Sequence, residues 1–350
     1  MTPRASRQAA GDQPDSGHAS GPSPLGVSVV ICAYTERRWE RTQAAVRSAL
    51  AQDPPPRQVL LVIDHNAKLA QMARRELGGV AILENAGAPG LSGARNTGLA
   101  AATEPVTVFL DDDAEALPGW LASLTEPFAR ADVVATGGSV RPRWPGARPA
   151  WLPPAFDWVV GCSYLGLPDA QVPIRNPIGA NMSMRTGLAL DAGGFSTIVG
   201  RVGGKPRGCE ETELAIRLTA SQPGGVVLYV PTAAVDHYVA RERVRLGYFL
   251  RRCWNEGVSK AIVVRLAGAG PGLERERQHA TVVIPRAMAA DLRAFCTGKP
   301  AALARAVVAA FGLAAATGGY LSGRLSAAGA PQRAARGGQP RLAAWRAARR

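Results

Sequence analysis

The chain has 350 residues, 47% of them hydrophobic, and a formal net charge of +14. This length and composition are enough for one large core with appendages, and they argue against two full domains. The five cysteines lie far apart, with neither the paired spacing of a metal site nor the density of a disulfide scaffold, so we expect a protein of the reducing cytoplasm.

The first third of the chain alternates between predicted strands and helices. Residues 1–26 are rich in Pro, Gly and Ser, lack an apolar run long enough for a signal peptide, and are expected to form a disordered leader. Residues 27–33 are a continuous β-branched run, typical of a strand covered on both faces. Further strands are expected at residues 59–63, 80–83 and 106–110, and helices at 38–51, 68–77 and 94–102. This order predicts an α/β fold with an open, doubly wound, mainly parallel sheet and helices on both faces.

Acidic residues follow two of these predicted strands. Asp64 ends the second strand, and Asp111, Asp112 and Asp113 end the fourth. Ligands of open α/β sheets bind beyond the carboxyl ends of the strands, so we expect these side chains at a binding edge. Three adjacent carboxylates repel one another, and a Mg²⁺ or Mn²⁺ ion that also binds phosphate would offset the repulsion. The alternative is an acidic turn that caps the next helix.

The second half of the core is less regular. Residues 141–177 are rich in Pro and Trp and suggest an ordered, irregular segment over the site. Beyond them, a strand is expected within residues 179–184, a helix at 210–219 and a strand at 226–230. Glu210 and Glu211 open that helix, where acidic residues either stabilise the first turn through the helix dipole or face the cleft as a general base.

Two further side chains have open roles. His237 follows the strand at 226–230 beside a carboxylate, and it is either a structural histidine or a metal ligand. Arg95 follows a glycine-bearing loop and either binds phosphate or pairs with an acid.

The C-terminal part is expected to add helices at residues 261–323. Residues 306–323 are uncharged and rich in Ala and Gly, and we favour a packed or interfacial helix there over a membrane span. Residues 324–350 carry seven arginines and no acid, which predicts a disordered basic tail. Three roles are open for such a tail: it is solvated without a partner, it contacts an anionic membrane surface, or it binds nucleic acid without specificity.

Taken together, seven segments resemble successive motifs of family 2 glycosyltransferases. They are VSVVICAYTE (27–36), the strand ending at Asp64, GLSGARNTGL (90–99), FLDDDA (109–114), IGANMSMR (178–185), GGF (193–195) and CEETELAIRL (209–218). The resemblance covers about residues 26–260, and the joint order and spacing of the motifs make it specific.

That resemblance implies a GT-A fold and an inverting transfer of sugar from a nucleotide diphosphate donor to an acceptor hydroxyl, assisted by Mn²⁺ or Mg²⁺. The catalytic domain would span residues 27–260, with a nucleotide-binding half at 27–115 and an acceptor half at 116–260. A polysaccharide, a glycolipid and a natural product all remain open as acceptors.

The resemblance also assigns roles by position. The nucleotide would contact Ala33, Tyr34, Glu36, Asp64, Arg95, Asp111 and Asp112, with Asp111 toward the ribose. Asp113 and His237 would hold the metal, Glu211 would be the catalytic base, and Asn181 and Glu210 would contact donor or acceptor sugar. This sequence departs from the family at the base. The family commonly has a Glu-Asp pair there, whereas this chain has Glu210-Glu211, so the side chain of the base is one methylene longer. Arg251–Trp254 lacks the spacing of the processive synthases, so we expect no processive enzyme.

Two other classes of protein share some of these sequence features. A nucleotidyltransferase also uses strand-end aspartates and metal, but it needs a basic glycine-rich loop after the first strand, where this chain has Tyr34, Thr35 and Glu36. A noncatalytic membrane or nucleic-acid binding module would not need the intact acidic motifs. We therefore expect a cytoplasmic enzyme without a specific nucleic-acid partner. Peripheral contact of its C-terminal region with the inner face of the membrane remains open.

Overall fold

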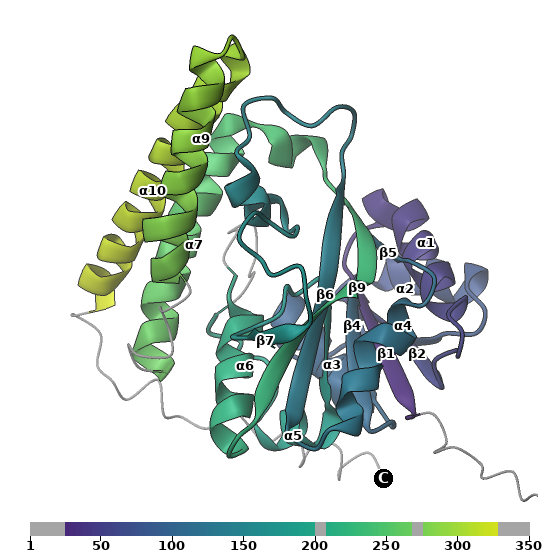
Figure 1. Cartoon of the computed structure of the whole chain (residues 1–350). Coiled ribbons are helices and arrows are strands. Elements are labelled where there is room, and N and C mark those ends of the chain that lie inside the picture. Colours follow the sequence, from purple (N-terminus) through teal and green to yellow (C-terminus); the bar gives the residue numbers. More distant parts are fainter. Residues whose placement is uncertain (1–24, 200–207, 268–275, 328–350) are drawn as a thin grey trace, which may run out of the picture.

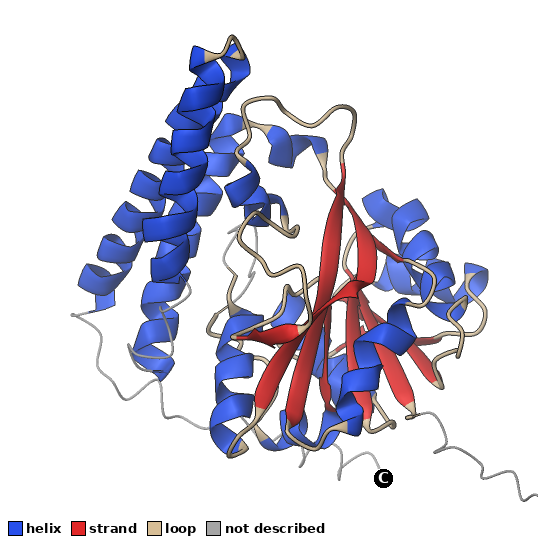
Figure 2. Ribbon diagram, viewed as in Figure 1, coloured by secondary structure: helices blue, strands red, loops and turns tan. Residues whose placement is uncertain are grey.

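A computed structural model of the chain describes residues 25–199, 208–267 and 276–327. It arranges them as one twisted sheet with helices on both faces, and a group of long C-terminal helices stands beside the sheet (Figure 1, Figure 2). Residues 1–24 of the predicted leader and residues 328–350 of the predicted tail lie outside the described residues.

The N-terminal half of the sheet is parallel. Its strands are β1 (Val27–Ala33), β2 (Gln58–Asp64), β3 (Ala81–Asn85) and β4 (Val106–Asp111). They lie in the order β3-β2-β1-β4, so the chain reverses its direction of travel across the sheet after β3. All four correspond to predicted strands, because buried parallel strands appear in sequence as continuous apolar runs. The carboxyl ends of β2 and β4 carry Asp64 and Asp111, as expected.

The C-terminal half of the sheet is mixed. It is built from β5 (Ala114–Ala116), β6 (Val133–Arg143), β7 (Val172–Ile174), β8 (Asn181–Arg185) and β9 (Val226–Tyr238). Strand β8 joins the two halves by pairing antiparallel with both β4 and β6, and β6 then pairs parallel with β9. Strand β9 is longer than predicted: it continues past Pro231, where the pairing shifts register, and so it includes His237. A bulge accommodates a proline that in sequence resembles the end of a strand.

Two sets of helices cover the sheet. On one face lie α1 (Trp39–Leu50), α2 (Ala67–Glu76) and α4 (Trp120–Thr125), and on the other α3 (Leu91–Ala101), α5 (Thr186–Asp191) and α6 (Glu210–Ser221). The alternation of β1 shows why both faces must be covered: Val29 and Ile31 belong to the first core, and Val30 belongs to the second. The predicted fold class is thereby confirmed.

The C-terminal helices make a third core. They are α7 (Leu246–Ala267), α9 (Ile284–Cys296) and α10 (Pro300–Ala327), joined by the π-helical turn η5 (His279–Val283) and packed on the 3₁₀ segment η3 (Pro154–Val160). The predicted domain boundary at 260/261 falls inside α7. Helix α10 contains the uncharged stretch 306–323 and packs along α7 and α9. Among the described residues it is the helix long and apolar enough to cross a bilayer, and 28% of its most apolar stretch is buried in the protein.

The packing of α3 against β1 generates a stability prediction. A Cβ atom at Gly98 of α3 would lie 2.4 Å from Val30 Cγ1, so Gly98→Ala should force the helix away from the sheet. We expect the free energy of unfolding to fall by about 1–3 kcal/mol, despite the better helix propensity of alanine. Gly78→Ala is the matched control, because nothing lies within 4 Å of its added methyl group. Urea denaturation measures both, and an unchanged Gly98→Ala midpoint would contradict the packing.

Candidate active site

A cavity of about 570 Å³ lies between the carboxyl end of β4, the first turn of α6 and the C-terminal helices. From the predicted site it is lined by Arg95, Asp111, Glu210, Glu211 and His237. Its far wall comes from residues of η3, η5, α7, α9 and α10, among them Phe156, Trp158, Arg252, Lys260, Ile284, Leu313, Ala316 and Tyr320. The cavity therefore joins the acidic strand end to the C-terminal helices.

Asp111, Asp113 and His237, here called the triad, form a cluster whose ligand atoms lie within 4.8 Å of one another. The pairing of β5 with β9 sets Ala114 opposite His237, and this register brings the imidazole beside the triplet. His237 Nε2 lies 3.2 Å from Asp113 Oδ1. Two carboxylates and one imidazole suit a divalent ion such as Mn²⁺ or Mg²⁺, so the protein has a site that can hold such a metal. Asp111, assigned to the ribose by resemblance, is thus also a candidate ligand.

Arginines neutralise the buried part of the triplet. Arg38 Nη1 lies 2.9 Å from both Asp112 Oδ1 and Asp113 Oδ2, and Arg243 Nη2 lies 3.7 Å from Asp113 Oδ2. Burial by itself would raise the pKa of Asp113, but the charges of His237, Arg243 and Arg38 outweigh it and hold the pKa below its ordinary value. Asp113 is therefore anionic at neutral pH, as a metal ligand requires.

Asp112 differs from its neighbour. Burial first, and then the charge of Asp113, raise the pKa of Asp112 to about 7. Its Oδ2 atom is buried and accepts no hydrogen bond from the described residues, while Oδ1 accepts from Arg38. Asp112 is not among the residues that line the cavity. The structure thus places it beneath the site, against Arg38, and direct contact with the nucleotide stays a prediction.

Arg95 connects the two sides of the cavity. Its side chain is 2% exposed and donates to Asp111 over 3.2 Å, to Glu210 over 3.1 Å and to the carbonyl of Gly179 over 2.9 Å. Of the two roles considered from sequence, the one seen here is pairing with acids. A single guanidinium group therefore fixes the end of β4 relative to the first turn of α6.

Glu210 and Glu211 begin α6 after Cys209, a non-glycine residue with φ of +76°. Glu210 is buried, and its Oε2 atom accepts no hydrogen bond from the described residues although it belongs to a cavity-lining side chain. Glu211 is half-buried and also lines the cavity. Burial, followed by the charge of Glu210, raises the pKa of Glu211 to about 7. This is the range in which a carboxylate accepts protons efficiently at neutral pH.

Four residues assigned to the nucleotide lie away from the cavity wall, near the ends of β1 and β2. Ala33 is buried at the end of β1, and the exposed Tyr34 accepts a hydrogen bond from Arg38 through its hydroxyl group. Glu36 accepts from the amide of Asn66. Asp64 accepts from Asn85 and from the backbone N–H of Gly90, which fixes the glycine-bearing loop. Their contact with a nucleotide stays a prediction.

Asn181 has a structural role in this arrangement. Its side chain is fully buried on β8 and is not among those that line the cavity. The amide oxygen accepts from Trp120 Nε1 over 2.8 Å, and the amide nitrogen donates to the carbonyls of Ser139 and Ala233. These bonds tie β8 to α4, β6 and β9, so a sugar could reach Asn181 only by displacing them.

Several charged residues of the site were not predicted. Arg38 and Arg243 lie outside the recognised motifs. The cavity wall also holds an ion-pair network made of Arg175, Arg252, Glu256, Lys260 and Glu276. Lys260 Nζ lies 2.8 Å from Glu276 and 3.3 Å from Glu256. The i, i+4 spacing of Arg252, Glu256 and Lys260 was a visible signal, because side chains at that spacing meet on one helix face.

Comparison with known proteins gives one matching family model and close structural likeness. The model of Glycosyl transferase family 2 matches residues 28–189. A glucosyl-dolichyl phosphate glucuronosyltransferase of Haloferax volcanii is 32% identical over 243 residues, which cover 68% of this chain and 77% of the relative.

Two solved structures are similar to this chain, and the first shares its overall architecture. A mannosyltransferase of Pyrobaculum calidifontis, solved in complex with GDP-Man and Mn²⁺, superposes with a TM-score of 0.53 at 20% identity, over 85% of this chain and 87% of that one. GalNAc-T7, solved with UDP, GalNAc and Mn²⁺, covers 74% of this chain at 18% identity and a TM-score of 0.48, and the chain spans 55% of its length.

The doubly wound sheet has a GT-A fold, and together with the family model and the curated relative it defines this protein as a glycosyltransferase. The chain belongs to glycosyl transferase family 2.

The triad generates a prediction about metal binding. His237→Ala removes the imidazole ligand, and we expect the affinity for Mn²⁺, measured by electron paramagnetic resonance of free Mn²⁺, to fall by at least about tenfold. His65→Asn is the control, because His65 lies outside the triad and Asn tolerates its positive φ of 49°. Equal Mn²⁺ affinity in the two variants would exclude His237 as a ligand.

Proposed function

We propose that this protein transfers a sugar from a nucleotide diphosphate donor to an acceptor hydroxyl, with inversion at the anomeric carbon. One observation carries the proposal: Asp111 and His237 of the triad share a single cavity with Glu211. Direct displacement needs stabilisation of the leaving group on one side of the reacting carbon and a base on the other. The joined cavity offers both.

The donor would lie at the strand end. A divalent ion held by Asp111, Asp113 and His237 would supply neutralisation of the charge that develops on the diphosphate leaving group. Tyr34, Glu36 and Asp64 stand at the ends of β1 and β2, on the same edge of the sheet as Asp111, where the base and ribose would extend. Arg95 keeps Asp111 oriented toward this edge through the 3.2 Å ion pair.

Glu211 would take the proton of the acceptor hydroxyl as that oxygen attacks. Its half-buried position gives a substrate access, and its raised pKa makes the carboxylate a competent acceptor near neutral pH. Glu210 stands beside it with one buried oxygen that no described residue satisfies. A sugar hydroxyl bound in the cavity would donate to that oxygen and remove the cost of its isolation.

The acceptor we infer is a sugar carried on a lipid phosphate. The support comes from the Haloferax volcanii relative, whose name specifies transfer of glucuronic acid to glucosyl-dolichyl phosphate. The apolar side chains of the far cavity wall, such as Phe156, Ile284 and Leu313, are compatible with an amphiphilic molecule. An enzyme with that acceptor would work in the cytoplasm at the inner face of the membrane, which it would contact through its C-terminal helices.

Removal of the base should separate binding from turnover. We expect Glu211→Gln to lower the rate of transfer to a synthetic glucosyl polyprenyl phosphate by about 10²- to 10⁴-fold. Donor binding, measured as the thermal shift produced by UDP-glucuronic acid or GDP-mannose with Mn²⁺, should persist. The control is Glu242→Gln, an exposed glutamate of η4 outside the cavity. Full activity of the Glu211→Gln enzyme would refute the assignment.

The raised pKa of Glu211 also predicts a pH profile. Only the ionised carboxylate accepts a proton, so kcat/KM should rise with pH through an apparent pKa of about 7 and level off above it. Replacing Glu211 with Asp should move or flatten this limb, whereas Glu242→Gln should leave it in place. If kcat/KM of the wild-type enzyme instead rose through an apparent pKa near 4.5, the ordinary value for glutamate, the profile would contradict a base with a raised pKa.

A further inference from the structure

Helix α10 is apolar on all sides although the protein covers only one of them. Its inner side packs along α7 and α9, where Ala302, Ala306 and Ala309 are buried. Its outer side exposes large apolar side chains: Leu303, Val307, Phe311, Leu321 and Leu325, which we call the outer stripe. Phe311 is 60% exposed and Leu325 is 77% exposed. A helix at the surface of a soluble protein would carry polar residues there.

The outer stripe is one continuous face. Positions 303, 307, 311, 321 and 325 return to the same side of a helix with 3.6 residues per turn. In the interval, Ala314 is exposed on that side, and Gly318 packs against Trp254 of α7, a side chain that is itself 44% exposed. Helices α9 and α10 lie side by side as an antiparallel hairpin (Figure 1). Leu292 and Phe295 of α9, 47% and 41% exposed, extend the apolar surface near the hairpin turn. An exposed apolar surface that contains the five side chains of the outer stripe indicates that this helix binds a partner.

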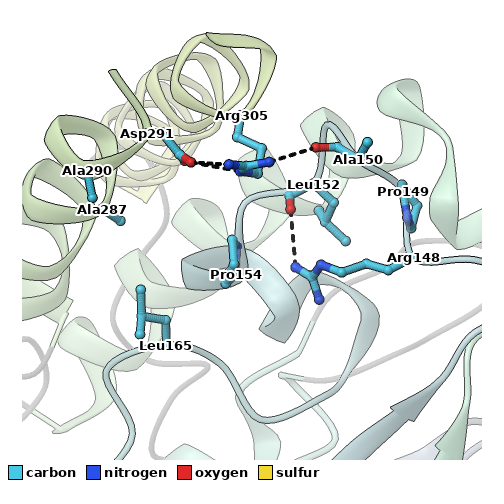
Figure 3. Close-up of a pocket in the computed structure, with 10 residues that line it drawn as sticks. All are labelled: Arg148, Pro149, Ala150, Leu152, Pro154, Leu165, Ala287, Ala290, Asp291 and Arg305. Carbon is cyan, nitrogen blue, oxygen red and sulfur yellow. Dashed lines mark hydrogen bonds and ion pairs between the residues drawn. The ribbon is translucent and has the colours of Figure 1, made fainter. Parts of the chain in front are cut away.

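The charges around the outer stripe indicate which partner. Between residues 302 and 323 the charged side chain is Arg305, and it turns inward to Asp291 of α9 and the carbonyl of Ala150 (Figure 3). The residues that flank this stretch are basic: Lys299 precedes α10, and Arg324 lies in its last turn. Residues 328–350 add six arginines and no acid. An apolar face flanked by cations matches an anionic lipid surface.

We propose that the outer stripe of α10 rests on the surface of an anionic lipid bilayer, with the helix axis parallel to the membrane plane. This inference rests on the peripheral membrane contact proposed above and names the surface that makes it. A membrane-crossing orientation is disfavoured because α10 packs along α7 and α9, which expose Arg251, Arg286 and Arg293. A crossing helix would draw those charges toward the hydrocarbon.

The placement has a consequence for the acceptor. Leu313, Ala316 and Tyr320 of the same helix line the cavity that holds Glu211. One face of α10 would thus touch lipid while another borders the acceptor, and a helix with its side chains is about 10–12 Å across. The cavity would thus lie about one helix diameter above the bilayer. An acceptor anchored in the lipid would reach it if its sugar stood roughly 10–12 Å above the membrane surface.

The test uses the full-length protein and vesicles of phosphatidylcholine with or without phosphatidylglycerol. Wild-type protein should co-sediment with the anionic vesicles, and Val307→Glu/Phe311→Glu should lower the partition coefficient by about tenfold or more. The matched control is Ile198→Glu, since Ile198 is 52% exposed and belongs to the segment between α5 and α6, outside the outer stripe. Phe311→Gln is a milder variant that keeps the test valid if the double variant fails to fold.

Each alternative result overturns the inference. Equal sedimentation of wild-type and stripe variants would exclude the outer stripe as the contact. Wild-type protein that resists carbonate extraction from membranes would indicate a span. A smaller mass by light scattering for the stripe variant, without vesicles, would indicate self-association through this face. The thermal shift with donor nucleotide and Mn²⁺ is followed in the same samples, so its loss with vesicle binding retained would refute the catalytic proposal alone.

Discussion

Burial of carboxylates at the end of β4 is the constraint on which the site depends. Asp112 and Asp113 are both buried, and a buried charge without a partner costs several kcal/mol. The partners come from two distant segments: Arg38 from the turn after β1 and Arg243 from the turn after β9. The paths of these turns are therefore determined by the aspartates, and so is the position of His237, whose strand must pass beside Asp113.

Buried ion pairs also join the N-terminal half of the sheet to helix α6. Arg95 is buried between Asp111, which is 16 positions away in the sequence, and Glu210, which is 115 positions away. Because its charge is shared by both carboxylates, neither side can move away without leaving an unpaired ion in a desolvated place. The proposed transfer needs the leaving-group site and the base held in fixed relation, and these ion pairs of Arg95 would give that rigidity before any substrate arrives.

The sequence predicted the parallel half of the sheet well and the mixed half less completely, for reasons visible in single residues. Continuous apolar runs identify β1, β2, β3 and β4, but Pro231 concealed the continuation of β9, because a bulge keeps the strand intact there. Resemblance to the family brought together Asp113, His237 and Glu211, and it could not foresee the arginines that neutralise the triplet. Asn181 illustrates the limit: its motif position suggested a sugar contact, whereas its amide bonds three other groups in the core. Such choices depend on distances between elements, which no local pattern encodes.

The bulge in β9 has its own consequence for how this chain can change over evolutionary time. Alternate residues of a strand point to opposite faces, and β9 resumes regular pairing from Ala234, so the register of the stretch from Ala234 to His237 sets which side of the ribbon the imidazole occupies. Gain or loss of a single residue within that stretch would shift the register and turn the imidazole away from the aspartates. Length variation should therefore be absent from this short stretch.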